Sequence, residues 1–216
     1  MPVDLNNLQA TRYEVVNPGE NGIAVVTLNR PESRNAQNKR MTYELEACFS
    51  AASRSSQVKV IVLQADGPHF SSGHDMRDDE SHREFDLVFP VGGFGREGQE
   101  GQMAWEEEVY FNMCWRWRNL PKPVIAAAQG KTIAGGLMLL WVADIIIAAD
   151  DAMFTDPVVG MGVNGALIGY CLSQAYRLAD AQQLPLLNTS VCPWRCSGGC
   201  SSSEICQLGK SGRASC

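Results

Sequence analysis

The stretch LPKPVIAAAQGKTIAGGLMLLWVADIIIAADDAMF, residues 120–154, carries the strongest structural signals in this chain. Its apolar runs are separated by Gly135 and Gly136 and by Asp144. A central aspartate costs roughly 2.5–3.5 kcal/mol on membrane-insertion scales, so the apolar part favours a helix and a strand over a membrane span. In order, the pattern predicts a strand (124–128), a buried helix opened by the two glycines, a buried strand (145–149) and a short extended segment (152–155).

Strand-like and helical patterns also alternate on the N-terminal side of this stretch. A dense turn signal at 17–21 lies between two β-branched runs and predicts a hairpin. Residues 66–102 hold the three histidines and several glycines without a period, so a long functional or mobile loop is expected there. The alternation predicts an α/β domain with strands at 13–16, 22–28 and 58–64 and helices at 39–53 and 105–117.

The composition is typical of a soluble globular protein. Of the 216 residues, 45% are hydrophobic and 19% are charged, which excludes a wholly disordered chain. The formal net charge of −6 argues against a nucleic-acid partner and against binding to an anionic membrane surface. The first residues do not have the pattern of a signal peptide, so we expect a cytoplasmic protein with free thiols.

The composition changes sharply near Gly165. Six of the eight cysteines follow it, in a segment with few charges and no histidine. Their spacing does not match a metal site with short, recognised ligand intervals, so no metal is expected. We divide the chain into an N-terminal lead (1–11), a domain (12–165) and a Cys-rich tail (166–216). The tail is expected to be partly helical and then disordered, as a frame-shifted or truncated end.

Three further segments, together with 120–154, have a recognisable order. They read GIAVVTLNRPESRNA at 22–36, HFSSGHDM at 69–76 and DPVVGMGVNG at 156–165. In this order they resemble the enoyl-CoA hydratase/isomerase (crotonase) superfamily over residues 12–165. The resemblance implies a crotonase-like α/β spiral of ββα units that takes an acyl-CoA thioester in fatty-acid or acyl-CoA metabolism. Coenzyme A then arrives as part of the substrate, no other cofactor is needed, and a homo-trimer or hexamer is expected.

The resemblance also implies where the thioester binds. Two backbone N–H groups, of His74 and Gly135, would hold the oxygen that becomes negative when an enolate forms. Arg30 or Arg34 would contribute to phosphate recognition. The residues expected to wrap the coenzyme A portion are Arg34, Asn35, Ala36, Ser72, Gly73, Asp75, Met76 and Gly136.

The chain departs from the family at its two catalytic glutamates. By alignment these positions hold Met138 and Val158, and a third acidic position of some isomerases falls near Ala166. Neither methionine nor valine can transfer a proton, so two-glutamate hydration is not expected. Asp156 is a substitute acid or base, although a turn-capping role before Pro157 is the simpler interpretation.

Other carboxylates compete with Asp156 for that role. Glu107 and Glu108 are candidates for facing the acyl pocket, but a solvated helix start is favoured for both. Asp75 is expected to hold its turn through side-chain-to-backbone hydrogen bonds. Two function classes therefore stay open. One is an isomerase- or hydrolase-type enzyme that uses the two amides without the glutamates. The other is an inactive remnant that binds CoA esters weakly or associates with homologues.

Overall fold

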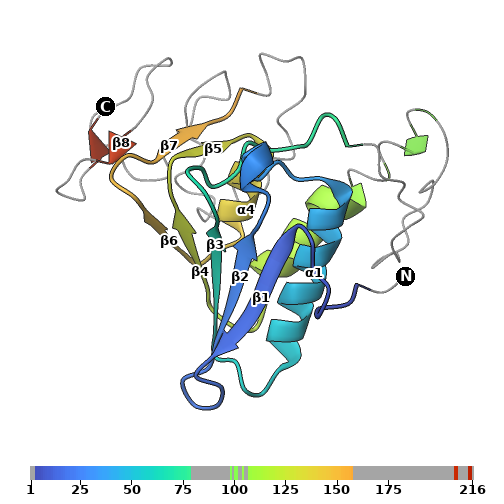
Figure 1. Ribbon diagram of the computed structural model, residues 1–216, viewed down its shortest axis with the longest axis vertical. Helices are drawn as coiled ribbons and strands as arrows, with labels where there is room; N and C mark the ends of the chain where they lie inside the picture. The colour runs from blue at the N-terminus through green and yellow to red at the C-terminus, as the bar shows by residue number, and fades with distance from the viewer. Residues whose placement is uncertain are drawn as a thin grey trace.

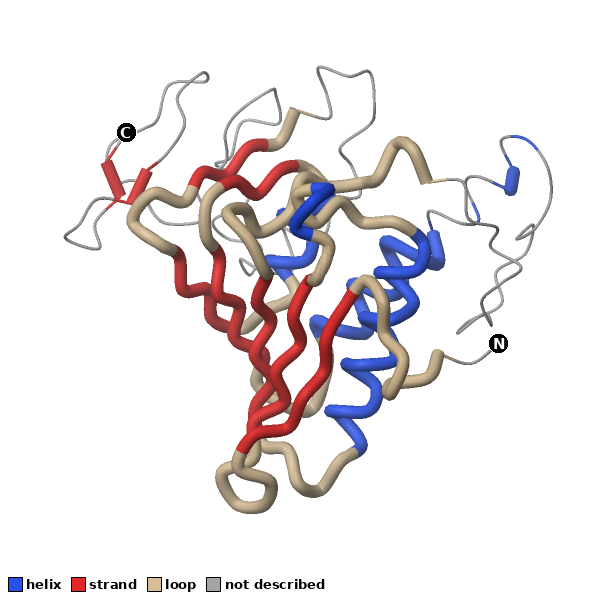
Figure 2. Tube along the Cα trace, viewed as in Figure 1, coloured by secondary structure: helices blue, strands red, loops and turns tan. Residues whose placement is uncertain are grey.

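The computed structural model describes residues 3–78 and 107–157, together with residues 98, 100, 101 and 104 and two short strands near the C-terminus. Five strands form one sheet in the order β1-β2-β3-β4-β6 (Figure 1). The helices lie on one side of this fan of strands (Figure 2). Of the tail predicted at 166–216, only β8 (Gln207–Leu208) and β9 (Ala214–Ser215) are described, and Val158 and Ala166 lie outside the described residues.

The sheet begins with the predicted hairpin and continues with parallel strands. β1 (Thr11–Val16) is antiparallel to β2 (Ile23–Leu28). The next neighbours, β3 (Val60–Ala65), β4 (Val124–Ala128) and β6 (Ile145–Ala148), each pair in parallel. Parallel neighbours need a crossover connection, and helices supply it here. The expected α/β class is therefore confirmed.

The first crossover helix, α1 (Lys39–Arg54), is held by a cap at its start and by contacts of two buried side chains. Asn38 caps its start, because the side-chain oxygen accepts the amide of Met41 at 3.0 Å. Phe49 packs on Trp117 of α3 (Met113–Arg118), with ring centroids 5.2 Å apart. The buried carboxylate of Glu44 accepts the amides of residues 9–11, which replace its lost hydration.

One prediction about these elements is wrong, and a second is confirmed with a different helix type in its first part. The strand expected to be buried at 145–149 is the edge strand β6, where Ile145 and Ile147 are 53% and 61% exposed. Alternate residues of a strand face opposite sides, so these two isoleucines point away from the core. The helix expected at 105–117 contains a π-helix, η3 (Glu107–Asn112), before α3 begins. Within the described residues, no helix is long and apolar enough to cross a membrane.

A second, two-stranded sheet lies at the carboxyl end of the main sheet. The sequence did not predict its first strand, β5 (Lys131–Ile133), which pairs in parallel with β7 (Met153–Thr155). The extended segment expected at 152–155 is thus confirmed as part of β7. β5 leads directly into α4 (Gly135–Trp141), and both elements lie above the ends of β3 and β4 (Figure 1). In open α/β sheets this is the end at which ligands bind.

Candidate functional site

Two segments far apart in the sequence meet at this end of the sheet. Ser71 forms a parallel bridge with Thr132, because its carbonyl accepts the amide of Ile133 at 2.9 Å. A Cβ atom added to Gly136 would lie 2.7 Å from the carbonyl oxygen of Ser71. A Cβ atom on Gly73 would lie 3.2 Å from the amide nitrogen of Gly135. The glycines therefore permit a backbone approach that no larger residue would allow without displacement.

The direction of the His74 amide follows from a second bridge. Gln37 donates its amide to the carbonyl of Gly73 at 2.8 Å and accepts the amide of Asp75 at 3.0 Å. In a parallel bridge of this kind, the residue between the two bonded ones points its own N–H to the opposite side. The amide of His74 is thus directed away from the backbone of Gln37.

Backbone strain lies immediately before Gly135. Ala134 has φ 48° and ψ −115°, a conformation that L-residues rarely adopt, and its amide donates to the carbonyl of Thr155 at 3.0 Å. Such conformations cost about 1–3 kcal/mol and cluster at functional sites. The sharp turn allows β5 to end and α4 to begin within one residue. Gly135, as the first residue of α4, then carries an N–H that has no partner within the helix.

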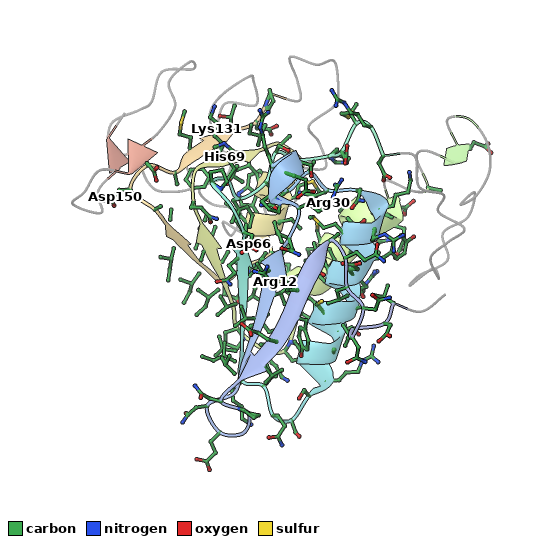
Figure 3. The ribbon with its side chains drawn as sticks, viewed as in Figure 1. Arg12, Arg30, Asp66, His69, Lys131 and Asp150 are labelled. Carbon is green, nitrogen blue, oxygen red and sulfur yellow. The ribbon has the colours of Figure 1, made fainter. Side chains whose placement is uncertain are left out.

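The turn at residues 30–36 is held by one buried side chain. Asn35 is fully buried, accepts the amide of Arg30 at 2.8 Å, and donates to the carbonyls of Asp66 and His69 at 2.8 and 3.0 Å. Its own carbonyl accepts the hydroxyl of Ser71 at 2.8 Å. The side chain of Asn35 therefore joins the turn to residues 69–76, which we call the histidine loop. Figure 3 places Arg30, Asp66 and His69 at this same end of the sheet.

Asp75 holds the loop as predicted. Its carboxylate accepts the amide of Arg77 at 3.1 Å and forms a half-buried ion pair with Arg30 at 2.9 Å. Burial alone would raise the pKa of Asp75, but the hydrogen bonds and charges of Arg30 and Arg77 outweigh it, and the net pKa is lowered. Arg30 is thus committed to Asp75 and to the carbonyl of Ala36, whereas Arg34 is exposed on the turn.

The candidate proton-transfer positions lie in different surroundings. Met138 is only 2% exposed on α4. Asp156 directly follows Thr155, the β7 residue paired with Ile133, so it lies one residue beyond the strand beside the Ala134 turn. Val158, the second of the substituted glutamate positions, is not among the described residues.

The favoured interpretation of Glu108 is wrong. Glu107 is exposed, but Glu108 is fully buried and pairs with Arg116 at 3.0 Å. Glu108 lies in the π-helix η3, beside the buried Val109. Burial, only partly offset by Arg116 and Asn112, raises the pKa of Glu108.

Residues 18–190 match the family described as enoyl-CoA hydratase/isomerase. The chain belongs to this family. EchA13 of Mycobacterium tuberculosis, named as an enoyl-CoA hydratase, is 38% identical over 166 residues, which cover 74% of this chain and 50% of EchA13. The mitochondrial Δ(3,5)-Δ(2,4)-dienoyl-CoA isomerase of Mus musculus is 34% identical over 142 residues, covering 64% of this chain and 41% of the isomerase.

Solved structures of the family share this fold. The crystal structure of an enoyl-CoA hydratase/isomerase from Marinobacter aquaeolei superposes with a TM-score of 0.67 at 29% identity, covering 83% of this chain and 63% of the other. The crotonase-like α/β arrangement expected from the sequence is therefore confirmed. The chain spans half or less of the length of the two relatives named above.

Proposed function

We propose that the protein binds an acyl-CoA thioester and holds its carbonyl oxygen between the amides of His74 and Gly135. The observation that carries this proposal is the hydrogen-bonded contact between the histidine loop and β5, with close backbone approach at Gly73 and Gly136. The oxygen gains negative charge when the acyl chain loses a proton at C2. In comparable sites, loss of one such donor costs roughly 2.7–4 kcal/mol of transition-state stabilisation.

The coenzyme A portion is proposed to lie along the exposed edge of the turn at residues 30–36 and of the loop at residues 69–76. Ser72 donates its amide to the carbonyl of Arg34 at 3.0 Å, so these two segments run together. Arg34 is exposed there, and Met76 is 82% exposed farther along the same loop. Arg34 supplies the positive charge for phosphate, whereas the buried Asn35 and Ala36 shape the turn beneath it.

Isomerisation of a double bond is the chemistry that this residue set supports best. Hydration by the family's pair of acids is not available at Met138, which carries no titratable group. Moving a double bond from C3 to C2 needs only one group that removes a proton from C2 and returns it to C4. The likeness to a protein named as a dienoyl-CoA isomerase supports this choice. Asp156 directly follows Thr155, the β7 residue that pairs with Ile133 and accepts the amide of Ala134.

A second candidate function is binding without catalysis. It is favoured by Met138, which stands at a position where hydratases of the family carry a catalytic glutamate. In that case the protein would bind CoA esters, or associate with homologous subunits in a trimer or hexamer, without catalysing a reaction.

Two measurements separate these functions. Calorimetric titration with butyryl-CoA tests binding, and a 3-enoyl-CoA assay tests isomerisation through the absorbance of the conjugated product. Arg34→Glu should weaken binding of the CoA ester, and the loss should shrink at high salt because the contact is electrostatic. Glu32→Lys, on the same turn, is the matched charge change and should not weaken binding. Failure of the wild type to bind butyryl-CoA would exclude both functions that depend on the thioester.

A further inference from the structure

The imidazole of His74 lies against Gly135. A Cβ atom built on Gly135 would lie 2.9 Å from Nδ1 and 3.3 Å from Cε1 of His74. The ring therefore packs on the α-carbon of the residue whose amide is proposed to hold the thioester oxygen. His74 is half-buried, so the ring is neither wholly enclosed nor a freely solvated loop side chain.

Gln37 borders the same point. Its side-chain nitrogen donates to the hydroxyl of Ser71 at 3.2 Å, which leaves Oε1 on the other side of the amide. That oxygen would lie 3.4 Å from a Cβ atom on Gly135. Gln37 is buried, so its amide is confined between the histidine loop and the start of α4. The space beside Gly135 is therefore bordered by an uncharged amide oxygen and by an imidazole.

From this placement we propose that the imidazole of His74 is the proton carrier of the site. The inference rests on the proposed thioester function and assigns its acid–base step. An imidazole both accepts and donates a proton near neutral pH, which a general acid–base catalyst must do. The amide of His74 is proposed to hold the thioester oxygen, and its imidazole would lie close to C2 of the acyl chain. One residue would therefore both stabilise the enolate and accept the proton that leaves C2.

The other titratable groups that the structure describes near the loop are poorer carriers. Asp75 is paired with Arg30, and its lowered pKa makes it a weak base. His69 uses Nδ1 to accept the amide of Lys131 at 3.2 Å, on β5. Glu108 is paired with Arg116 on the helical segment that precedes β4. Asp66 and Asp78 are paired with Arg12 and Lys39. Asp156 is a rival, and the experiment below distinguishes it from His74.

The proton step is balanced within the substrate and this side chain. A neutral imidazole nitrogen takes the proton from C2 of a 3-enoyl thioester. The C–H electron pair then forms the C1–C2 double bond, and the carbonyl electrons move to the oxygen held by the two amides. When the carbonyl re-forms, the C1–C2 pair moves to C2–C3, and the former C3–C4 pair takes the proton from the imidazolium at C4. Histidine ends neutral, and the product is the 2-enoyl thioester.

Exchange of the C2 protons of butyryl-CoA in D2O tests the proposal directly. A saturated acyl chain cannot isomerise, so deuterium incorporation, followed by mass spectrometry, reports only the removal and return of a proton at C2. His74→Asn retains the backbone amide and a polar atom near the Nδ1 position but cannot carry a proton. Removal of a general base typically costs 10²–10⁴-fold, so exchange should fall by about that factor. His69→Asn is the matched control and should exchange like the wild type.

Two further measurements keep the outcomes distinct. Butyryl-CoA titration of His74→Asn should give binding close to that of the wild type, and the circular dichroism of the two should agree. In His74→Ala, added imidazole should restore part of the exchange, which a structural role for the ring would not explain. Unchanged exchange in His74→Asn would overturn the proposal, and so would a wild type that binds but does not exchange. Loss of exchange in Asp156→Asn alone would transfer the role to Asp156. No binding by the wild type would instead overturn the proposed function.

Discussion

Replacing Gly136 with alanine tests the contact between the histidine loop and α4. The added Cβ atom would lie 2.7 Å from the carbonyl oxygen and 3.0 Å from Cβ of Ser71. Ser71 cannot yield easily, because its backbone is bridged to β5 and its hydroxyl donates to Asn35. Overpacking of this kind costs about 1–3 kcal/mol, and alanine recovers up to about 1 kcal/mol through its greater helix propensity. We expect a net loss of about 1–2 kcal/mol in the free energy of unfolding.

Urea unfolding followed by circular dichroism measures this loss. For a chain of this size, about 1 kcal/mol corresponds to a shift of roughly 2–4 °C in Tm, so heating provides an independent check. Gly135→Ala is the matched comparison, because its new Cβ atom meets the end of the movable His74 side chain rather than a bridged backbone. It should destabilise the protein less than Gly136→Ala. Equal or greater stability of Gly136→Ala than of the wild type would refute the close approach of the two segments.

Two other predictions concern the backbone and the charges around the site. Ala134→Gly should raise the free energy of unfolding by about 1 kcal/mol in urea titrations. Glycine relieves the strain of a φ of 48°, and this gain exceeds the entropy that glycine adds to the unfolded chain. A loss of stability would contradict the strained turn. Asp75→Asn should destabilise the protein at neutral pH. The lowered pKa of Asp75 contributes stability above its unfolded value near 3.8, and that contribution is lost as the pH falls through the lower folded value. The gap between wild type and variant should therefore narrow below pH 3.8, and a gap that does not change with pH would contradict the ion pair with Arg30.

The strands of the main sheet were predictable because their signals are local. The turn residues at 17–21 define the hairpin, and the apolar runs at 58–64 and 124–128 have the length and branching of strands. β5 was not predictable in the same way. It is three residues long and includes Lys131 and Thr132, and it forms only because β7 and Ser71 come alongside it. The exposure of Ile145 and Ile147 likewise depends on which strand lies at the edge of the sheet.

The candidate site was likewise predictable only in those features that have a local sequence signal. The resemblance implies that His74 and Gly135 act together, and the structure brings their two segments together. The contact of the His74 ring with Gly135 depends on a side-chain direction that no motif encodes. Three of the hydrogen bonds of Asn35 could not be foreseen either, because their partners Asp66, His69 and Ser71 lie more than 30 positions away. Glu108 was assigned to a solvated helix start because it belongs to a run of acidic residues, but the structure buries it and pairs it with Arg116.

Infrared difference spectroscopy of bound butyryl-CoA, carrying ¹³C at the thioester carbonyl, tests the central claim most directly. Two amide donors that polarise the carbonyl weaken its double bond, so the labelled C=O stretch should move to lower frequency on binding. In Gly136→Ala, which disturbs the contact between the two segments, the shift should be smaller. A bound thioester that absorbs at its solution frequency would contradict the assignment of the His74 and Gly135 amides as the donors that hold its oxygen.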